Sequence, residues 1–155
     1  FITAKSCDNI AVNKTLSEAL DVEINVSSYS LDDKYYKESL QTSGLLMADL
    51  LVLPKSLLPE NSIDKEFVPL KTDELKLFGI DCGNLEFYVK NGENYAIKIY
   101  DDTTKTNLFD KWTKFEGEDY YLLLNNVRPN AAPYSSGKVT TTNAFVALSI
   151  MLKNA

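Results

Sequence analysis

The chain has 155 residues, 45% hydrophobic and 25% charged, which is the composition of one globular domain and not of a disordered chain. Its net charge is -6 and Arg128 is its single arginine, so we expect no nucleic acid partner, because phosphate binding needs clustered basic side chains. Histidine is absent, which removes the usual general base and the usual zinc ligand. We therefore expect a protein that is not an enzyme and that holds no metal or cofactor.

The two cysteines, Cys7 and Cys82, lie far apart and lack the spacing of a metal site. They either form one disulfide, if the compartment is oxidising, or act as two small buried side chains. The chain opens at Phe1 without an initiator methionine, so we expect a processed segment. It contains no apolar run long enough to cross a bilayer, and we expect membrane attachment only through an anchor upstream of Phe1.

The first third of the chain alternates between strand and helix patterns. Residues 1–4 predict a strand, and a polar turn with Asp8 or Asn9 as N-cap leads into a helix with apolar side chains at helical spacing. Residues 22–26 alternate apolar and polar side chains, which is typical of a half-covered strand.

A second helix and a third strand complete this pattern. Residues 30–33 resemble a capping box, with Asp33 in place of the usual Glu or Gln, and predict a helix start. Residues 48–54 form a continuous apolar run that ends at Pro54, which predicts a central strand covered on both faces. Strand, helix, strand, helix, strand is the order of a parallel sheet with right-handed crossovers.

The second half of the chain is less regular. The pair Asn91 and Gly92 suits a tight hairpin turn between two apolar strands, and Thr141 or Thr142 predicts the cap of a final helix. In chain order we expect a short helix at 56–58, a loop at 59–66, strands at 67–70, 85–89 and 95–100, a polar loop at 101–107, a strand at 120–124 and a loop at 129–137.

Four segments in this order resemble one lobe of a bacterial extracellular solute-binding protein of ABC transporters. They are the run ADLLVLP at 48–54, FVPL at 67–70, the hairpin VKNGENYAI at 89–97, and the strand at 120–125 with the helix at 143–152. The resemblance implies one α/β domain over residues 1–155, a three-layer, mostly parallel sheet with flanking helices plus a β-hairpin, as in a periplasmic-binding-protein-like lobe. It also implies an extracytoplasmic location, in a secreted or membrane-anchored protein.

The chain departs from that family in one respect. Roughly 20 residues separate Tyr100 from Tyr120, which leaves no room for a second lobe of at least ~50 residues. The closure of two lobes around a solute is therefore missing. We expect a single lobe with a modest pocket.

The first candidate site lies where parallel strands end, because ligands of open α/β sheets bind beyond the carboxyl ends of the strands. Three loops meet there, and backbone amides at helix starts could receive polar or anionic groups of a solute. The alternative interpretation is that Ser, Asp and Asn at these positions only cap helices. The candidate residues are Ser6, Asp8, Asn9, Tyr29, Lys55 and Ser56.

The second candidate site is the loop at 126–134. Arg128 could bind a carboxylate in a bidentate manner while Tyr134 stacks on a sugar or an apolar group. The alternative is a solvated arginine beside a surface tyrosine.

Three functions of different classes fit these features. The first is a non-catalytic, extracytoplasmic module that binds a small-molecule solute, and the second is a scaffold domain that docks an envelope protein through an apolar patch. The third is a hydrolase with paired carboxylates, for which we expect ordinary pKa values because the acidic residues lie in polar loops. Those residues are Asp101, Asp102, Glu116, Glu118 and Asp119.

Overall fold

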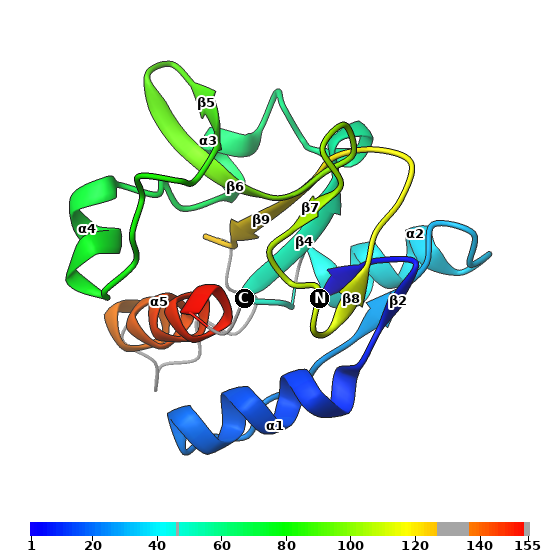
Figure 1. Ribbon diagram of the computed structural model, residues 1–155, viewed down its shortest axis with the longest axis horizontal. Coiled ribbons are helices and arrows are strands. Elements are labelled where there is room, and N and C mark those ends of the chain that lie inside the picture. The colour runs from blue at the N-terminus through cyan, green and yellow to red at the C-terminus, as the bar shows by residue number, and fades with distance from the viewer. Residues whose placement is uncertain (46, 127–136, 154–155) are drawn as a thin grey trace.

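The computed structural model describes residues 1–45, 47–126 and 137–153, with the backbone alone described at 137–142. It shows a central sheet with helices on both faces (Figure 1). The sheet order is β3 (Ser28–Tyr29), β1 (Ile2–Thr3), β4 (Leu50–Pro54), β9 (Tyr120–Leu124), β6 (Glu93–Asp101) and β5 (Phe87–Lys90), with β7 (Thr106–Asn107) also paired to β6.

The directions of the strands make this a mixed sheet. β1 pairs in parallel with both β3 and β4, which confirms the parallel sheet predicted from the first third of the chain. β9 is antiparallel to both β4 and β6, so β6 runs in the same direction as β4. β5 and β7 are antiparallel to β6. The predicted α/β class with flanking helices is confirmed, but antiparallel pairing on the β9 side makes the sheet mixed.

The helices cover the two faces of the sheet in two groups. The face of the first hydrophobic cluster carries α1 (Asn9–Leu20), α4 (Thr72–Leu77) and α5 (Gly137–Lys153). The opposite face carries α2 (Tyr36–Ser39), continued by a π-helical turn at Leu40–Gly44, and α3 (Ile63–Glu66). A short 3-10 helix, Lys55–Leu57, follows β4.

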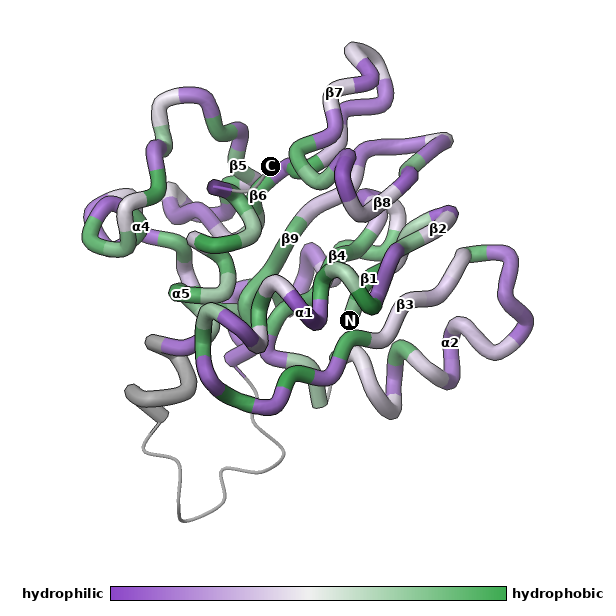
Figure 2. The backbone as a smooth tube through the Cα atoms, turned by 60° about the horizontal axis from the view of Figure 1, so that its bottom comes forward, coloured by the Kyte–Doolittle hydropathy of each residue, from purple (hydrophilic) through white to green (hydrophobic). Residues whose placement is uncertain are grey.

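The central strands separate these two clusters by the alternation of their side chains. In β4, Val52 packs on the α1 face while Leu51 and Leu53 pack on the opposite face. β9 does the same with Leu122 and Leu123. In Figure 2 both strands are mainly hydrophobic, whereas the turn beside β7 is hydrophilic. The prediction that residues 48–54 form a strand covered on both faces is confirmed.

Local sequence signals place α1 and the hairpin correctly. The carboxylate of Asp8 accepts a hydrogen bond from the Ala11 amide at 3.0 Å and caps α1, as predicted. The helix ends at Asp21, which adopts a left-handed conformation (φ 52°). Between β5 and β6, Asn91 (φ 52°) and Gly92 (φ 80°) form the predicted turn, where glycine tolerates positive φ without strain.

The strand predicted at 22–26 is absent. β1 pairs with Ser28 and Tyr29, so the next strand begins after this segment. Its alternation reflects one-sided burial, since Ile24 and Val26 pack on the first cluster and Glu23 is exposed. Alternation of apolar and polar side chains shows which side of a segment is covered. An extended segment can show this alternation without pairing to another strand.

Several other boundaries differ from prediction. Residues 31–35 form turns and the second helix begins only at Tyr36, because Asp33 accepts a hydrogen bond from the Tyr35 amide at 2.8 Å and holds a local turn. The predicted loop at 59–66 contains α3, the predicted strand at 67–70 is a single bridge from Phe67 to Asn125, and the loop predicted at 101–107 ends in β7. α4 was not predicted, and α5 begins before the predicted caps Thr141 and Thr142.

Neither cysteine forms a disulfide; Cys7 and Cys82 are both free. Within the described ranges, no helix combines the length and hydropathy needed to cross a bilayer.

Candidate functional site

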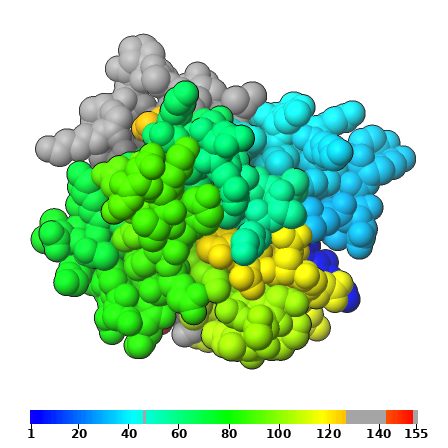
Figure 3. Space-filling view, turned by 90° about the horizontal axis from the view of Figure 1, so that it is seen from above, coloured from blue at the N-terminus to red at the C-terminus, as the bar shows by residue number. Residues whose placement is uncertain are grey.

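The carboxyl ends of β1 and β4, where the first candidate site was predicted, are covered by the chain itself. A second, two-stranded sheet forms there between β2 (Ser6–Cys7) and β8 (Thr113–Lys114). In Figure 3 the yellow surface of this part of the chain lies against the teal surface around residues 55–62. Backbone hydrogen bonds join the two sides, from Lys5 N to Lys114 O (2.9 Å), from Asp8 N to Trp112 O (2.8 Å) and from Lys55 N to Asp119 O (2.9 Å).

The covering segment, residues 102–119, is anchored by aromatic side chains. Phe109 is completely buried, and Trp112 and Phe115 are also buried in the first cluster. The side chain of Asn107 fixes the chain between them, accepting from the Phe109 amide at 2.8 Å and donating to the Thr113 carbonyl at 3.0 Å. This segment is therefore part of the core and not a loosely attached flap.

The predicted site residues of the first two loops already have structural roles. Ser6 is paired in β2, Asp8 caps α1, and Tyr29 stacks on the ring of Phe1 with centroids 5.6 Å apart. Asn9 begins α1, and its buried Oδ1 has no hydrogen-bond partner among the described residues. For Asp8 the capping interpretation accounts for the residue.

The third loop lies at an open depression of about 770 Å³ that is lined by Lys55, Ser56 and Glu118, among others. The amide of Ser56 donates to one carboxylate oxygen of Glu118 at 2.7 Å, and its hydroxyl donates to the other at 2.8 Å. The Ser56 amide and hydroxyl, which could receive an anionic solute, are thus already bound to a carboxylate of the same chain. The structure brings Lys55 and Ser56 together but does not join them with Ser6, Asp8 and Asn9 in one pocket.

The second candidate site lies outside the described residues. Both Arg128 and Tyr134 fall in the range 127–136, so their role stays a prediction.

Four of the five acidic residues considered for hydrolysis, Asp101, Asp102, Glu116 and Asp119, form ion pairs with lysines. Lys98 lies 2.6 Å from Glu86, 3.1 Å from Asp101 and 3.6 Å from Asp119. The Thr104 amide and then Lys98 lower the pKa of Asp101 to about 2. For Asp101 the expectation of an ordinary pKa is wrong, because backbone amides and the Lys98 ammonium group bind the charged form of its carboxylate.

The pKa of Asp102 is also lowered, mainly by a hydrogen bond from Lys105. A general acid needs a raised pKa, so these shifts run opposite to that role. Cys7 is likewise not activated, since burial raises the pKa of its thiol to about 11 and keeps it protonated. Among the described residues, no group of three or more Cys, Asp or Glu is placed to hold a metal ion.

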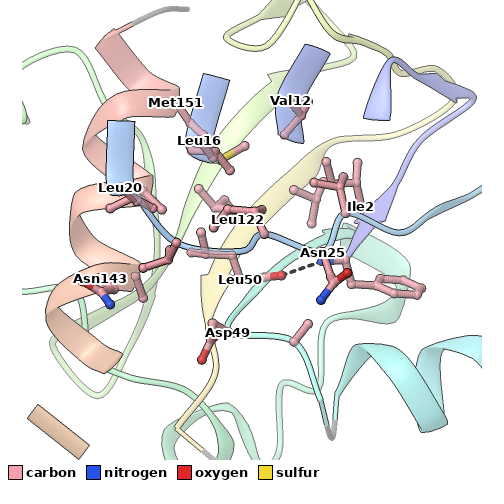
Figure 4. A pocket seen from close by; sticks show the side chains of 18 of the residues that line it. Ile2, Val12, Leu16, Leu20, Asn25, Asp49, Leu50, Leu122, Asn143 and Met151 are labelled. Atoms are coloured by element: carbon pink, nitrogen blue, oxygen red, sulfur yellow. Dashed lines mark hydrogen bonds between the residues drawn. The ribbon is translucent and has the colours of Figure 1, made fainter. Parts of the chain in front are cut away.

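The amino ends of the same strands border a cavity of about 390 Å³, which we call the α1–α5 cavity. Its floor is formed by Ile2, Val52 and Leu122 of the sheet, and its walls by Leu16 of α1 and Met151 of α5. These five side chains are buried and apolar. Figure 4 shows the α1 side chains and Met151 on one side of the cavity and the polar residues Asn25, Asp49 and Asn143 on the other.

Two asparagines hold the mouth of the cavity in place. Asn13 of α1 donates its side-chain amide to the carbonyl of Ile24 and ties the segment 22–26 to the helix. Asn125 donates to the carbonyls of Leu45 (2.6 Å) and Ala48 (3.1 Å), which fixes the turn before β4. The rim is therefore set by hydrogen bonds to both neighbouring segments.

Both methionines of the sequence line this cavity. Met151 is buried, and Met47 is 54% exposed at the mouth. Methionine side chains are flexible and polarizable, so they adapt to the shape of a bound molecule. This lining suits apolar molecules of varied outline.

Comparisons with family models, with curated proteins and with solved structures found no match. The site is therefore defined by its own geometry.

None of the predicted ligand-binding residues that the structure describes (Ser6, Asp8, Asn9, Tyr29, Lys55 and Ser56) lines the α1–α5 cavity. One signal pointed toward it: the alternation of Val22, Ile24 and Val26 marked one side of that segment as covered. Nothing in the sequence showed that α1 and α5 leave space between them, because this depends on how two helices far apart in the chain are placed on the sheet.

Proposed function

We propose that this chain is a non-catalytic binding module that holds a small, largely apolar molecule in the α1–α5 cavity. The observation that carries the proposal is the cavity itself, about 390 Å³ in volume and lined by apolar side chains with a few polar groups at one side. Ligand sites in proteins typically measure ~300–1,000 Å³ and have this mixture of lining groups.

The proposal retains the sequence-based hypothesis of an extracytoplasmic module that resembles one lobe of a solute-binding protein. The parallel arrangement of β3, β1 and β4 supports it. It moves the binding site from the carboxyl ends of the strands to their amino ends, because residues 112–119 cover the carboxyl ends.

Three features support a role without catalysis. The sequence has no histidine, the half-buried Cys7 thiol has a raised pKa, and the pKa of Asp101 and Asp102 is lowered. The α1–α5 cavity itself contains no serine, cysteine or lysine among its described lining residues. Such a lining is expected to bind a ligand without reacting with it.

The test is calorimetric titration of the protein with octanol, a neutral probe with an apolar chain. We expect saturable binding, and a rise in melting temperature because octanol binds the folded state. Replacing Ala147, which lines the cavity, by leucine should remove binding by filling the space. The control Ile10→Ala, at a side chain 82% exposed on α1, should bind octanol like the wild type. Equal binding by Ala147→Leu and the wild type would contradict the proposal.

A further inference from the structure

The polar side of the α1–α5 cavity is negatively charged. The two acidic residues that line the cavity, Glu23 and Asp49, are exposed, and the described lining includes no lysine or arginine side chain. Neither carboxylate takes part in an ion pair within the described residues. No lysine or arginine side chain neutralises them there, in a protein whose net charge is already -6. The amino group of Phe1 interacts with Asp49, but burial lowers the pKa of this amino group to about 6 and leaves it largely uncharged at neutral pH.

The opposite side of the cavity is apolar. Leu16 and Met151 lie across the cavity from Asp49 in Figure 4, and the amides of Asn25 and Asn143 lie on the same side as Asp49. The site is thus divided into an apolar part between the helices and a rim of carboxylate and amide groups. An amide side chain offers an acceptor oxygen as well as donors, and a carboxylate offers acceptors only.

We infer that the cavity selects amphipathic cations, with the apolar part of the ligand between α1 and α5 and an ammonium group against Glu23 and Asp49. This inference rests on the proposed function and adds the charge of the ligand. An ammonium group has three donors and a positive charge, which match the acceptors of the rim. A carboxylate at the same place would be repelled by both acidic side chains.

Three probes with the same chain test this inference: octylamine, octanol and octanoate, compared by calorimetry at neutral pH and low salt. We expect octylamine to bind about ten-fold more tightly than octanoate, with octanol between them, because each solvent-exposed carboxylate contributes a factor of about two to five. The preference should shrink in concentrated salt, where exposed charges are screened.

Variants locate the source of the preference. Asp49→Asn together with Glu23→Gln should bring the affinities for octylamine and octanoate to within about two-fold of each other. Glu18→Gln is the matched control, since Glu18 is an exposed carboxylate on α1 that does not line the cavity. It should keep the wild-type preference.

The outcomes separate the two proposals. If octanol binds but octylamine and octanoate bind equally, or octanoate binds more tightly, the cationic ligand is refuted while the apolar binding site stands. If none of the three probes binds, the proposed function fails and the inference fails with it. If the preference survives in the double variant, the cation is recognised elsewhere and the assignment to Glu23 and Asp49 is wrong.

Discussion

The carboxyl and amino ends of the central strands differ in what surrounds them: hydrogen-bonded polar groups at the carboxyl ends and an apolar cavity at the amino ends. At the carboxyl ends, polar groups are bonded to residues 112–119, and the Ser56 amide and hydroxyl are bonded to Glu118. At the amino ends, apolar side chains of the sheet, α1 and α5 surround a cavity. A polar group that already has a partner must lose it before it binds a solute, whereas an apolar cavity offers surface that is still unfilled. The comparison favours the amino ends as the binding site.

The largest expected effect tests whether the covering segment is part of the core. Phe109 is completely buried beside Trp112, with ring centroids 6.0 Å apart. Phe109→Ala should therefore lower the free energy of unfolding by about 3–5 kcal/mol, measured by urea denaturation. The exposed control Ile10→Ala should change it by less than ~0.5 kcal/mol. A loss below ~1 kcal/mol for Phe109→Ala would show that residues 102–119 form a detachable flap.

A matched pair of substitutions tests whether the amino ends hold empty space. Ala96 in β6 is completely buried in the second cluster, so Ala96→Leu should cost about 1–3 kcal/mol through overpacking. Ala147 lines the α1–α5 cavity, so Ala147→Leu should cost less than ~1 kcal/mol or be stabilising. Equal losses in the two variants would mean that the cavity has no room for added methyl groups.

A smaller effect is expected at the carboxyl ends. Glu118→Gln replaces the charged acceptor that binds Ser56 and should lower the free energy of unfolding by about 1 kcal/mol. The control Glu18→Gln removes a solvent-exposed carboxylate 4.0 Å from Lys14 and should change stability by less than ~0.5 kcal/mol. Octanol binding by both variants should equal that of the wild type, and weaker binding by Glu118→Gln would place the ligand at the carboxyl ends.

The smallest effect concerns the pH dependence of stability. The pKa of Asp101 is about 2 in the folded protein, below the value of roughly 4 for an unfolded aspartate. Its stabilising contribution is therefore complete above pH ~4 and disappears as the pH falls toward about 2. Asp101→Asn should flatten the loss of stability in that window, measured by thermal unfolding. An unaltered acid profile in Asp101→Asn would contradict the lowered pKa.

The sequence predicted the features that depend on interactions between residues close together in the chain. The cap at Asp8, the turn at Asn91 and Gly92, and the buried strand ended by Pro54 rest on short-range signals, and these were correct. The four-residue helix α3 is too short for a periodic signal and was missed. α4 has six residues and was missed for the same reason. The helix that includes α2 was predicted, but its start was placed too early because Asp33 holds a local turn.

Long-range pairing explains why the sequence pointed to the carboxyl ends of the strands, whereas the proposal places the site at their amino ends. The antiparallel pairing of β2 with β8 places Ser6 opposite Lys114, and no local sequence pattern near either residue predicts this pairing. Glu118 was considered as a catalytic acid, but its contact with Ser56 spans 62 positions of the sequence. A sequence indicates which residue types can bind a ligand, while the fold decides which of them already bind each other.

Methyl NMR of protein labelled at its two methionines tests the central claim most directly. Met47 and Met151 both line the α1–α5 cavity, so each gives a signal from the proposed site, and Met47→Leu assigns them. Titration with octanol should shift both signals along one saturation curve that matches the calorimetric affinity. Binding detected by calorimetry without a shift of either signal would show that the ligand lies elsewhere and would contradict this account.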